Sequence, residues 1–128
     1  MAKVATTEWF KSLGDMLNAN PNFAKAAKGF IVDILFIADE ERKTVFSIHD
    51  GAVVDVHAGQ PGDEEKLEFV IEATPEVWAN VQSGKQAPRL AIMMGKINLV
   101  KGSQVKLLKY LAAAGLIFDV MRDVPTEV

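Results

Sequence analysis

The sequence contains no cysteine, only two histidines and no long apolar run. The absence of cysteine excludes disulfides, cysteine nucleophiles and thiolate metal sites, and two histidines leave little for an imidazole-based metal centre. No run approaches the roughly 20 residues of a membrane helix, and the first residues lack the apolar stretch of a signal peptide. With 128 residues, 49% of them hydrophobic, we expect one globular cytoplasmic domain over residues 1–128.

Acidic residues are missing from one long stretch of the chain. The net charge of −3 hides a segment, residues 77–118, that has no Asp or Glu but contains Lys85, Arg89, Lys96, Lys101, Lys106 and Lys109. Such a block attracts anionic head groups, coenzyme A phosphates or acidic membranes, although lysines also line ordinary solvated faces. We predict transient contact with an anionic membrane surface through Lys96, Lys101, Lys106 and Lys109. The acidic remainder and the few aromatics near these lysines argue against nucleic acid.

The first half of the chain predicts two helices followed by strands. A helix over 8–18, capped by Thr7, places Trp9, Leu13, Met16 and Leu17 on one face. Asn20 and Pro21 are typical of a cap and first turn, and this short helix ends near Gly29. Residues 30–39 are rich in β-branched and aromatic side chains and predict a strand.

A β-hairpin follows, with strands over 43–48 and 52–57. A three-residue loop, His49-Asp50-Gly51, places Phe46, Ile48, Val54 and Val56 on one face. A two-residue Asp50-Gly51 turn would send Val54 and Val56 to the other face, so the three-residue loop is the prediction. Residues 66–73 then predict a strand whose inward side chains are Leu67, Phe69 and Ile71.

The second half is mainly helical. Thr74 and Pro75 begin a helix that buries Val77, Trp78 and Val81 and ends at Gly84, and a short helix runs from Pro88 to Gly95. Residues 96–101 alternate as a strand with Ile97 and Leu99 on one side. Ser103 caps a helix that is predicted to bury Val105, Leu108, Leu111 and Ala112, to expose Lys106 and Lys109, and to break at Gly115. A last amphipathic stretch, stopped by Pro125, contains Ile117, Val120, Met121 and Val124.

These elements predict an α+β domain with a five-stranded, mostly antiparallel sheet covered on one face by helices. Catalytic patterns are weak: the sequence has neither a nucleophile elbow nor a phosphate-binding glycine loop, and hence no cofactor motif. His49, Asp50, Asp55 and His57 are expected at the surface. Asp33, with Tyr110 and Asp119, leaves open a steroid-isomerase-like proton transfer if its carboxyl is buried, whereas alternation in the strand favours a solvent-facing Asp33.

Residues 75–84 together with the run Met94-Gly95-Lys96-Ile97-Asn98-Leu99-Val100-Lys101-Gly102-Ser103 resemble the sterol carrier protein family. That family has a short helix ending at a glycine, a second helix, and a strand bracketed by two glycines that leads into an apolar helix. The order of elements agrees over nearly the whole chain. Ser103 stands where an Asp is usual, and it serves equally as a helix cap.

The resemblance implies an apolar tunnel between sheet and helices that binds fatty acids, acyl-coenzyme A, sterol-like or isoprenoid lipids without catalysis. The sequence leaves a monomer and a homodimer as alternatives. On this analogy the C-terminal helix is the movable wall, and we predict ligand contacts from Trp78, Val81, Leu90, Met93, Met94, Leu108, Leu111, Ile117, Phe118 and Met121. An enzyme, or an accessory factor of quinone biosynthesis, is the alternative.

Overall fold

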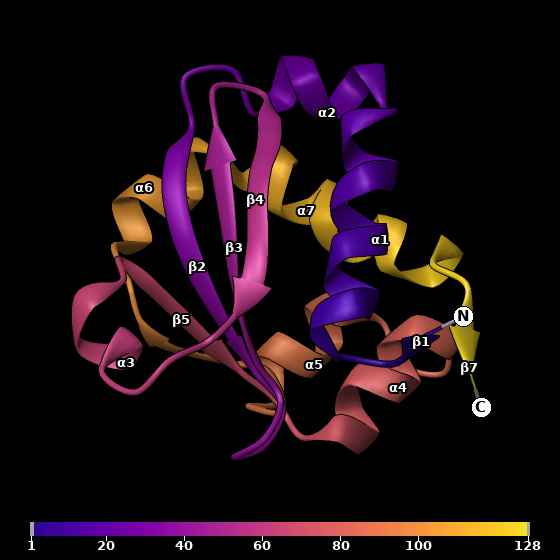
Figure 1. Ribbon diagram of the computed structural model, residues 1–128. Helices are drawn as coiled ribbons and strands as arrows, with labels where there is room; N and C mark the ends of the chain where they lie inside the picture. Colours follow the sequence, from indigo (N-terminus) through magenta and orange to yellow (C-terminus); the bar gives the residue numbers. More distant parts are fainter. Residues whose placement is uncertain (1, 128) are drawn as a thin grey trace.

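The computed structural model describes residues 2–127 and contains a five-stranded mixed sheet with the strand order β4-β3-β2-β5-β6 (Figure 1). Its strands are β2 (Ile31–Ile37), β3 (Lys43–His49), β4 (Ala52–Ala58), β5 (Phe69–Glu72) and β6 (Asn98–Lys101). Only β2 and β5 pair in parallel; the other neighbours are antiparallel. The α+β class and the mostly antiparallel sheet are confirmed.

Helices cover one face of this sheet in two groups (Figure 1). The first group is α1 (Thr7–Asn18) and α2 (Pro21–Ala26), and α1 packs against β4. The second group is α4 (Pro75–Ser83), α5 (Pro88–Met93), α6 (Gln104–Lys109), α7 (Leu111–Val120) and the 3₁₀ turn η1 (Met121–Asp123). Two-residue strands β1 (Ala2–Lys3) and β7 (Thr126–Glu127) pair in parallel and join the two groups.

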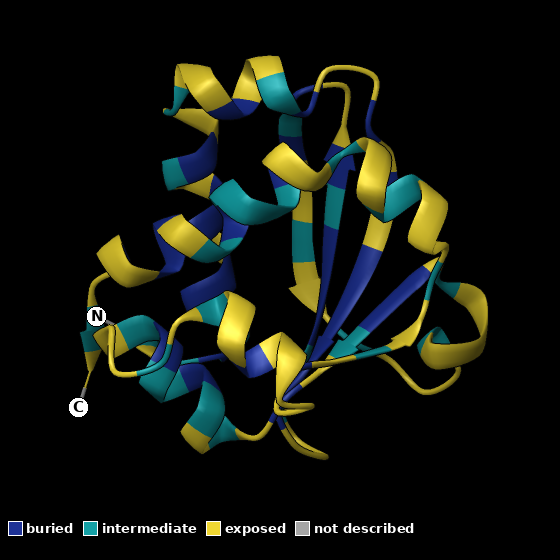
Figure 2. Ribbon diagram, turned by 180° about the vertical axis from the view of Figure 1, so that it is seen from behind, coloured by how far each residue is buried: buried dark blue, intermediate teal, exposed yellow. Residues whose placement is uncertain are grey.

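The core lies between α1, α4 and the centre of the sheet, and Figure 2 shows these inward surfaces buried. Phe10 stacks on Phe36 with ring centroids 4.8 Å apart, and Trp78 meets Phe36 edge to face at 5.9 Å. The Trp78 indole also donates a hydrogen bond to the Ile37 carbonyl at 3.2 Å. Aromatic rings packed in this way combine large apolar burial with favourable edge and face contacts.

The other face of the sheet is covered only in part. Leu35, Ile37, Val45 and Val70 form a small second cluster, and Leu67 packs on it next to the short helix α3 (Asp63–Lys66). The strand predicted over 66–73 is shorter in the structure, because Asp63–Lys66 is helical and β5 begins at Phe69. Leu67, predicted to face inward with Phe69 and Ile71, packs instead on this second cluster on the opposite face. Thr6, rather than Thr7, caps α1 and accepts a hydrogen bond from the Trp9 amide.

The hairpin register is a correction to the sequence prediction. His49 pairs with Ala52 across a two-residue turn in which Asp50 and Gly51 both have positive φ, 48° and 92°. This is the turn that the Asp-Gly dipeptide favours. A two-residue turn alone would put the inward side chains of the two strands on opposite faces, and a β-bulge corrects this. Ile48 pairs with Val53 but Ser47 pairs with Asp55, so β4 has one extra residue. That residue, Val54, is 61% exposed, and Val53 is buried in its place.

Helix α6 is turned the other way from the prediction. Val105 and Leu108 are 80% and 68% exposed, whereas Lys106 lies against the sheet and donates to the Ile31 carbonyl at 2.7 Å. The same ammonium contacts both Glu68 carboxylate oxygens at 2.9 Å. These distant partners fix the rotation of the helix, which local periodicity does not reveal.

Gly115 does not end the predicted helix. The helix is instead interrupted at Tyr110, between α6 and α7, and α7 runs through Gly115 from Leu111 to Val120. Leu111 and Ala112, which were predicted to be buried, are exposed. The next turn buries Met121 and Val124 as predicted, together with Ile117 and Val120 from α7.

Candidate functional site

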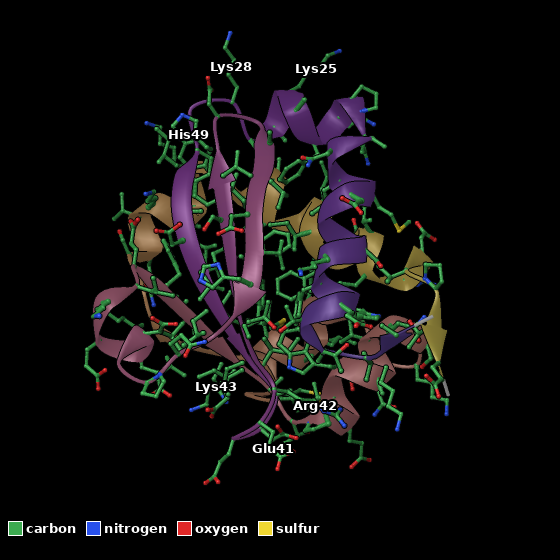
Figure 3. All side chains as sticks on the ribbon, viewed as in Figure 1. Lys25, Lys28, Glu41, Arg42, Lys43 and His49 are labelled. Carbon is green, nitrogen blue, oxygen red and sulfur yellow. The ribbon has the colours of Figure 1, made fainter. Side chains whose placement is uncertain are left out.

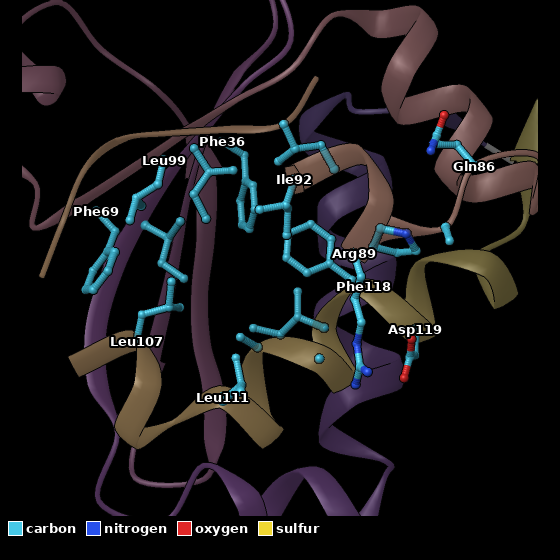
Figure 4. A pocket seen from close by; sticks show the side chains of 18 of the residues that line it. Phe36, Phe69, Gln86, Arg89, Ile92, Leu99, Leu107, Leu111, Phe118 and Asp119 are labelled. Atoms are coloured by element: carbon cyan, nitrogen blue, oxygen red, sulfur yellow. The ribbon is translucent and has the colours of Figure 1, made fainter. Parts of the chain in front are cut away.

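A cavity of about 730 Å³ lies between the second group of helices and the sheet (Figure 4). Its floor is formed by apolar side chains on the inner face of the sheet: Ile34, Phe36, Phe69, Ile71 and Leu99. Its walls come from α5, α6 and α7, chiefly Ile92, Leu107, Leu111, Ile117 and Phe118. Small-molecule sites in proteins commonly measure about 300–1,000 Å³ and are mostly apolar, so both the size and the lining suit an organic ligand.

Small residues of α7 keep this space empty. Ala114 and Gly115 face the cavity, and a Cβ placed on Gly115 would have no heavy atom within 4 Å. A glycine inside a helix costs up to about 1 kcal/mol relative to alanine. At this position the glycine contributes no packing, and its effect on the fold is to leave volume inside the cavity.

Four polar side chains gather at one end of the cavity. Gln86, Arg89, Asp119 and Arg122 line this end, and Figure 4 shows Gln86, Arg89 and Asp119 on the side opposite to Phe69 and Leu107. Within residues 2–127, neither arginine forms an ion pair shorter than 4.0 Å with a carboxylate. The end therefore combines two guanidinium groups with one carboxylate, a net positive charge. The cavity is amphipathic, with an apolar body and a cationic end.

The ten predicted ligand contacts fall into three groups. Leu111, Ile117 and Phe118 line the cavity. Trp78, Val81 and Met121 are buried behind its wall, and Trp78 stacks on Phe118 with centroids 6.4 Å apart. The remaining four point to solvent with exposures of 52, 82, 62 and 68%: Leu90, Met93, Met94 and Leu108. The structure thus does not bring the last two groups into the cavity lining.

Sequence reasoning missed three kinds of lining residue. Of the strand side chains, Phe36 was predicted only to lie in a strand and Leu99 only to share a side with Ile97, since alternation cannot separate a cavity floor from a packed core. Gly115 was interpreted as a helix break. Arg89 and Arg122 carried no signal in the sequence beyond their charge, and only the fold brings them together in the cavity lining.

The four lysines predicted to contact a membrane are not equivalent. Lys106 is paired with Glu68 against the sheet. Lys101 donates to the main-chain oxygens of Glu64 and Glu65, at 3.5 and 2.8 Å, which leaves its charge without a carboxylate partner. Lys96 and Lys109 are exposed, and Lys109 lies over the Tyr110 ring at 5.6 Å.

The catalytic alternative is not assembled by the fold. Asp33 lies on the solvent side of β2 and accepts a 2.6 Å hydrogen bond from Ser47, whereas its neighbours Ile34 and Phe36 face the cavity. Tyr110 stacks on Phe30 and donates to the Gly29 carbonyl at 2.9 Å. Of the three residues considered for proton transfer, only Asp119 lines the cavity.

The histidines lie outside the cavity as well. His49 is at the exposed hairpin end, away from Arg42 and Lys43 at the other end of the strand (Figure 3). His57 pairs with Asp55 at 2.8 Å on the exposed side of β4. Among residues 2–127, no three side chains of His, Asp or Glu are grouped as a metal site. Nor does that part of the chain contain a helix with the length and apolarity to cross a membrane.

Comparison with solved structures finds several of the same fold. A crystal structure of sterol carrier protein 2 superimposes with a TM-score of 0.79 at 26% identity, covering 96% of this chain and 100% of that one. A solution structure from Thermus thermophilus, described as possibly a sterol carrier protein, gives 0.75 at 25% identity and covers 99% and 93%. The chain has the sterol-carrier-type fold. No family model and no curated protein sequence matches it.

The fold alone extends to more distant proteins. A structure described as the UbiJ-SCP2 ubiquinone synthesis protein matches with a TM-score of 0.56 at 17% identity, over 82% of this chain and 84% of that one. The sterol carrier protein 2 neighbours support a lipid-binding or lipid-transfer domain.

In the sterol-carrier-type domain, the two glycines that bracket β6 have a clear physical role. Gly95 and Gly102 have φ of 74° and 146°, which L side chains rarely adopt. At Gly102, a Cβ would overlap the Phe69 ring, which forms part of the cavity floor. The glycine motif therefore sets how closely β6 approaches β5 beneath the cavity.

Proposed function

We propose that this domain binds and transfers a single lipid whose apolar part occupies the cavity and whose polar head lies at the cationic end. The observation that carries the proposal is the cavity itself: about 730 Å³ of space walled by aliphatic and aromatic side chains. Transfer of apolar surface from water into such a site contributes ~25 cal/mol per Å². Fatty acids, acyl-coenzyme A, and sterol-like or isoprenoid molecules all fit this description.

The cationic end favours a ligand with an anionic head. Arg89 and Arg122 present guanidinium groups that suit carboxylates and phosphates, and only Asp119 opposes them. Both arginines are exposed, so we expect each to contribute a modest amount, about 0.5–1 kcal/mol. Most of the binding free energy comes from the apolar part of the ligand.

Native mass spectrometry of the freshly purified protein, followed by solvent extraction, tests the proposal. We expect a co-purified lipid, or stoichiometric loading when fatty acids, acyl-coenzyme A esters, sterols or quinones are supplied. Gly115→Trp, which places a large ring in the empty space, should abolish loading while the fold is retained. Ala112→Trp is the matched control, since Ala112 is exposed on the same helix and should load normally. A wild-type protein that remains empty with every class of lipid would overturn the proposal.

The head-group assignment has its own test. Arg89→Gln combined with Arg122→Gln should weaken binding of a fatty acid by about five- to thirtyfold, the effect of roughly 1–2 kcal/mol. Binding of the corresponding fatty alcohol should not change. Lys85→Gln, another exposed cation but outside the cavity lining, is the control. An equal loss for acid and alcohol would show that the arginines shape the cavity rather than select an anion.

A second candidate is a role in holding an isoprenoid intermediate for quinone synthesis, which the likeness to the UbiJ-SCP2 protein suggests. Binding of polyprenylated phenols in preference to fatty acids would favour it. An enzymatic role would need a proton acceptor in the cavity. Asp119 is the candidate that lines the cavity, so turnover of a bound substrate that is lost in Asp119→Asn while lipid binding is retained would support an enzyme. Asp33→Asn, on the solvent side of β2, should change neither lipid binding nor turnover.

A further inference from the structure

The exposed apolar side chains of this domain are concentrated in one stretch of the chain. Large hydrophobic residues that are about half exposed or more occur at Ile31, Val54, Leu90, Ile92, Met93, Met94, Val100, Val105, Leu108 and Leu111. All except the first two lie within residues 90–111. Isolated exposed hydrophobics are ordinary, but such a concentration on a folded domain indicates a surface that is covered by something.

Contacts of helix α6 with the sheet leave its apolar residues Val105 and Leu108 exposed to solvent. Lys106 is fixed against the sheet by its bonds to the Ile31 carbonyl and to Glu68, so Val105 and Leu108 on the opposite side of the helix face outward. The same rotation of the helix places Leu107 in the cavity lining, so the helix has one leucine inside and leaves Val105 and Leu108 outside. The outward apolar side is therefore a fixed feature of the fold.

The same segment is cationic. No Asp or Glu occurs in residues 77–118, and two exposed lysines, Lys96 and Lys109, lie within the stretch 90–111 among the exposed apolar residues. The Lys101 ammonium contacts only main-chain oxygens among its hydrogen-bond partners and retains its charge. Apolar side chains among unneutralised lysines are the composition that binds anionic lipid interfaces, where each basic residue near the surface adds favourable electrostatic attraction.

The cavity opens on this surface. Ile92 of α5 and Leu111 of α7 both line the cavity and are 49% and 58% exposed, so they mark its mouth. In Figure 2, α5 and α6 lie on the outer side of the domain with much of their surface exposed, and Figure 4 looks into the space between Ile92 and Leu111. The exposed apolar residues of α5 thus lie on one side of the mouth, and those of α6 lie on the helix that directly precedes Leu111 on the other side.

We propose that this surface, made by α5, α6, the start of α7 and the neighbouring lysines, docks on anionic lipid bilayers with the cavity mouth facing the lipid. A second copy of the chain is a poorer occupant, because a symmetric dimer through this face would bring the same cations together. A lipid could then enter the cavity without crossing bulk water. This last step rests on the proposed function, whereas the docking itself does not.

Vesicle co-sedimentation tests the docking. Wild-type protein should bind vesicles of phosphatidylcholine containing phosphatidylglycerol, should bind pure phosphatidylcholine much more weakly, and should lose affinity as salt is raised. Val105→Ser with Leu108→Ser, and separately Lys96→Glu with Lys109→Glu, should each reduce binding to the anionic vesicles at least tenfold. All four side chains are exposed, so the fold should be unaffected.

Two matched controls locate the effect. Val54→Ser removes an equally exposed apolar side chain from β4, and Lys3→Glu with Lys11→Glu makes the same change in net charge on β1 and α1. Both should bind vesicles within twofold of wild type. Equal losses in the controls, or no binding by wild type, would overturn the proposal. So would a dimer in sedimentation velocity that dissociates in the Val105→Ser, Leu108→Ser variant.

The Gly115→Trp variant separates this proposal from the preceding one. If the cavity function is wrong, this variant and wild type will both fail to load lipid but will still bind anionic vesicles. If only the docking is wrong, wild type will load lipid from solution and ignore the vesicles.

Discussion

Two glycines inside helices on the same face of the sheet show how differently the two halves of the helical layer are built. At Gly14 in α1, a Cβ would lie 3.0 Å from Val53 Cγ1, so the missing side chain lets the helix approach β4 closely. At Gly115 in α7, a Cβ would meet nothing within 4 Å. The same residue type serves tight packing in one half and empty volume in the other. One face of the sheet therefore carries a close-packed core under α1 and a cavity under α5, α6 and α7.

Trp78 separates the two halves, since it packs on Phe36 and Phe10 on one side and on Phe118 of the cavity wall on the other. Trp78→Ala should lower the free energy of unfolding by about 3–5 kcal/mol, as expected for loss of a large buried aromatic. Leu111→Ala, in the exposed wall of the mouth, should cost less than about 1 kcal/mol. Urea denaturation of both variants checks the comparison, and equal costs would mean that the wall is packed like the core.

The length of the ligand's acyl chain tests the difference between the two halves, because only the half with the cavity has room for a longer chain. Each buried methylene should contribute ~0.8 kcal/mol, so hexadecanoate should bind on the order of 200-fold more tightly than dodecanoate. Calorimetric titration with monomeric fatty acids measures this dependence. A flat series would place the ligand on the surface of the domain.

Gly102→Ala disrupts the close contact between β6 and the Phe69 ring in the cavity floor. The positive φ and the overlap with the Phe69 ring should together cost about 2–3 kcal/mol of stability. Gly62→Ala is the control, with φ of 92° but open space around the new Cβ, and should cost about 1 kcal/mol from backbone strain alone. Thermal unfolding of the two variants should therefore show the larger fall in Tm for Gly102→Ala.

Alanine substitutions at the two helical glycines should have the smallest effect on stability, but they compare the packing of the two halves most directly. Gly115→Ala should stabilise the fold by about 0.5–1 kcal/mol, because helix propensity improves and the methyl group enters empty space. Gly14→Ala offers the same gain in propensity but forces Val53 to move, so it should be neutral or destabilising. If both substitutions stabilise equally, the two halves do not differ in packing as described.

Local chemistry was enough to predict most elements, because their signals lie within a few residues. Asn20-Pro21, Thr74-Pro75 and Ser103 each cap a helix where predicted. The apolar run 30–39 contains β2, and alternation correctly placed Asp33 on the solvent side. The predicted register of the hairpin was wrong, because the preference of Asp-Gly for a two-residue turn competed with the alternation of inward side chains. The structure keeps the two-residue turn, and a bulge brings Val53 inward.

The candidate site was harder to predict, because the cavity depends on how strands and helices that are distant in sequence pack together. The outward rotation of α6 depends on Lys106 reaching partners 75 and 38 positions away in sequence. With that rotation reversed in the prediction, Leu108 was assigned inward and Leu107 was overlooked. Met93 and Met94 were assigned to the ligand for their flexibility, yet helix α5 turns Pro88, Arg89 and Ile92 toward the cavity instead.

The most direct test of the account is to locate a bound lipid by nuclear magnetic resonance. In protein with ¹³C-labelled methyl groups and an unlabelled fatty acid, intermolecular NOEs should connect the acyl chain to Ile34, Ile71 and Leu99 on the cavity floor. None should reach Leu13, Leu17 or Val53 in the packed half of the layer. NOEs to those three methyl groups, or to neither set in a protein that binds the lipid, would contradict the claim that the half with the cavity is the binding site.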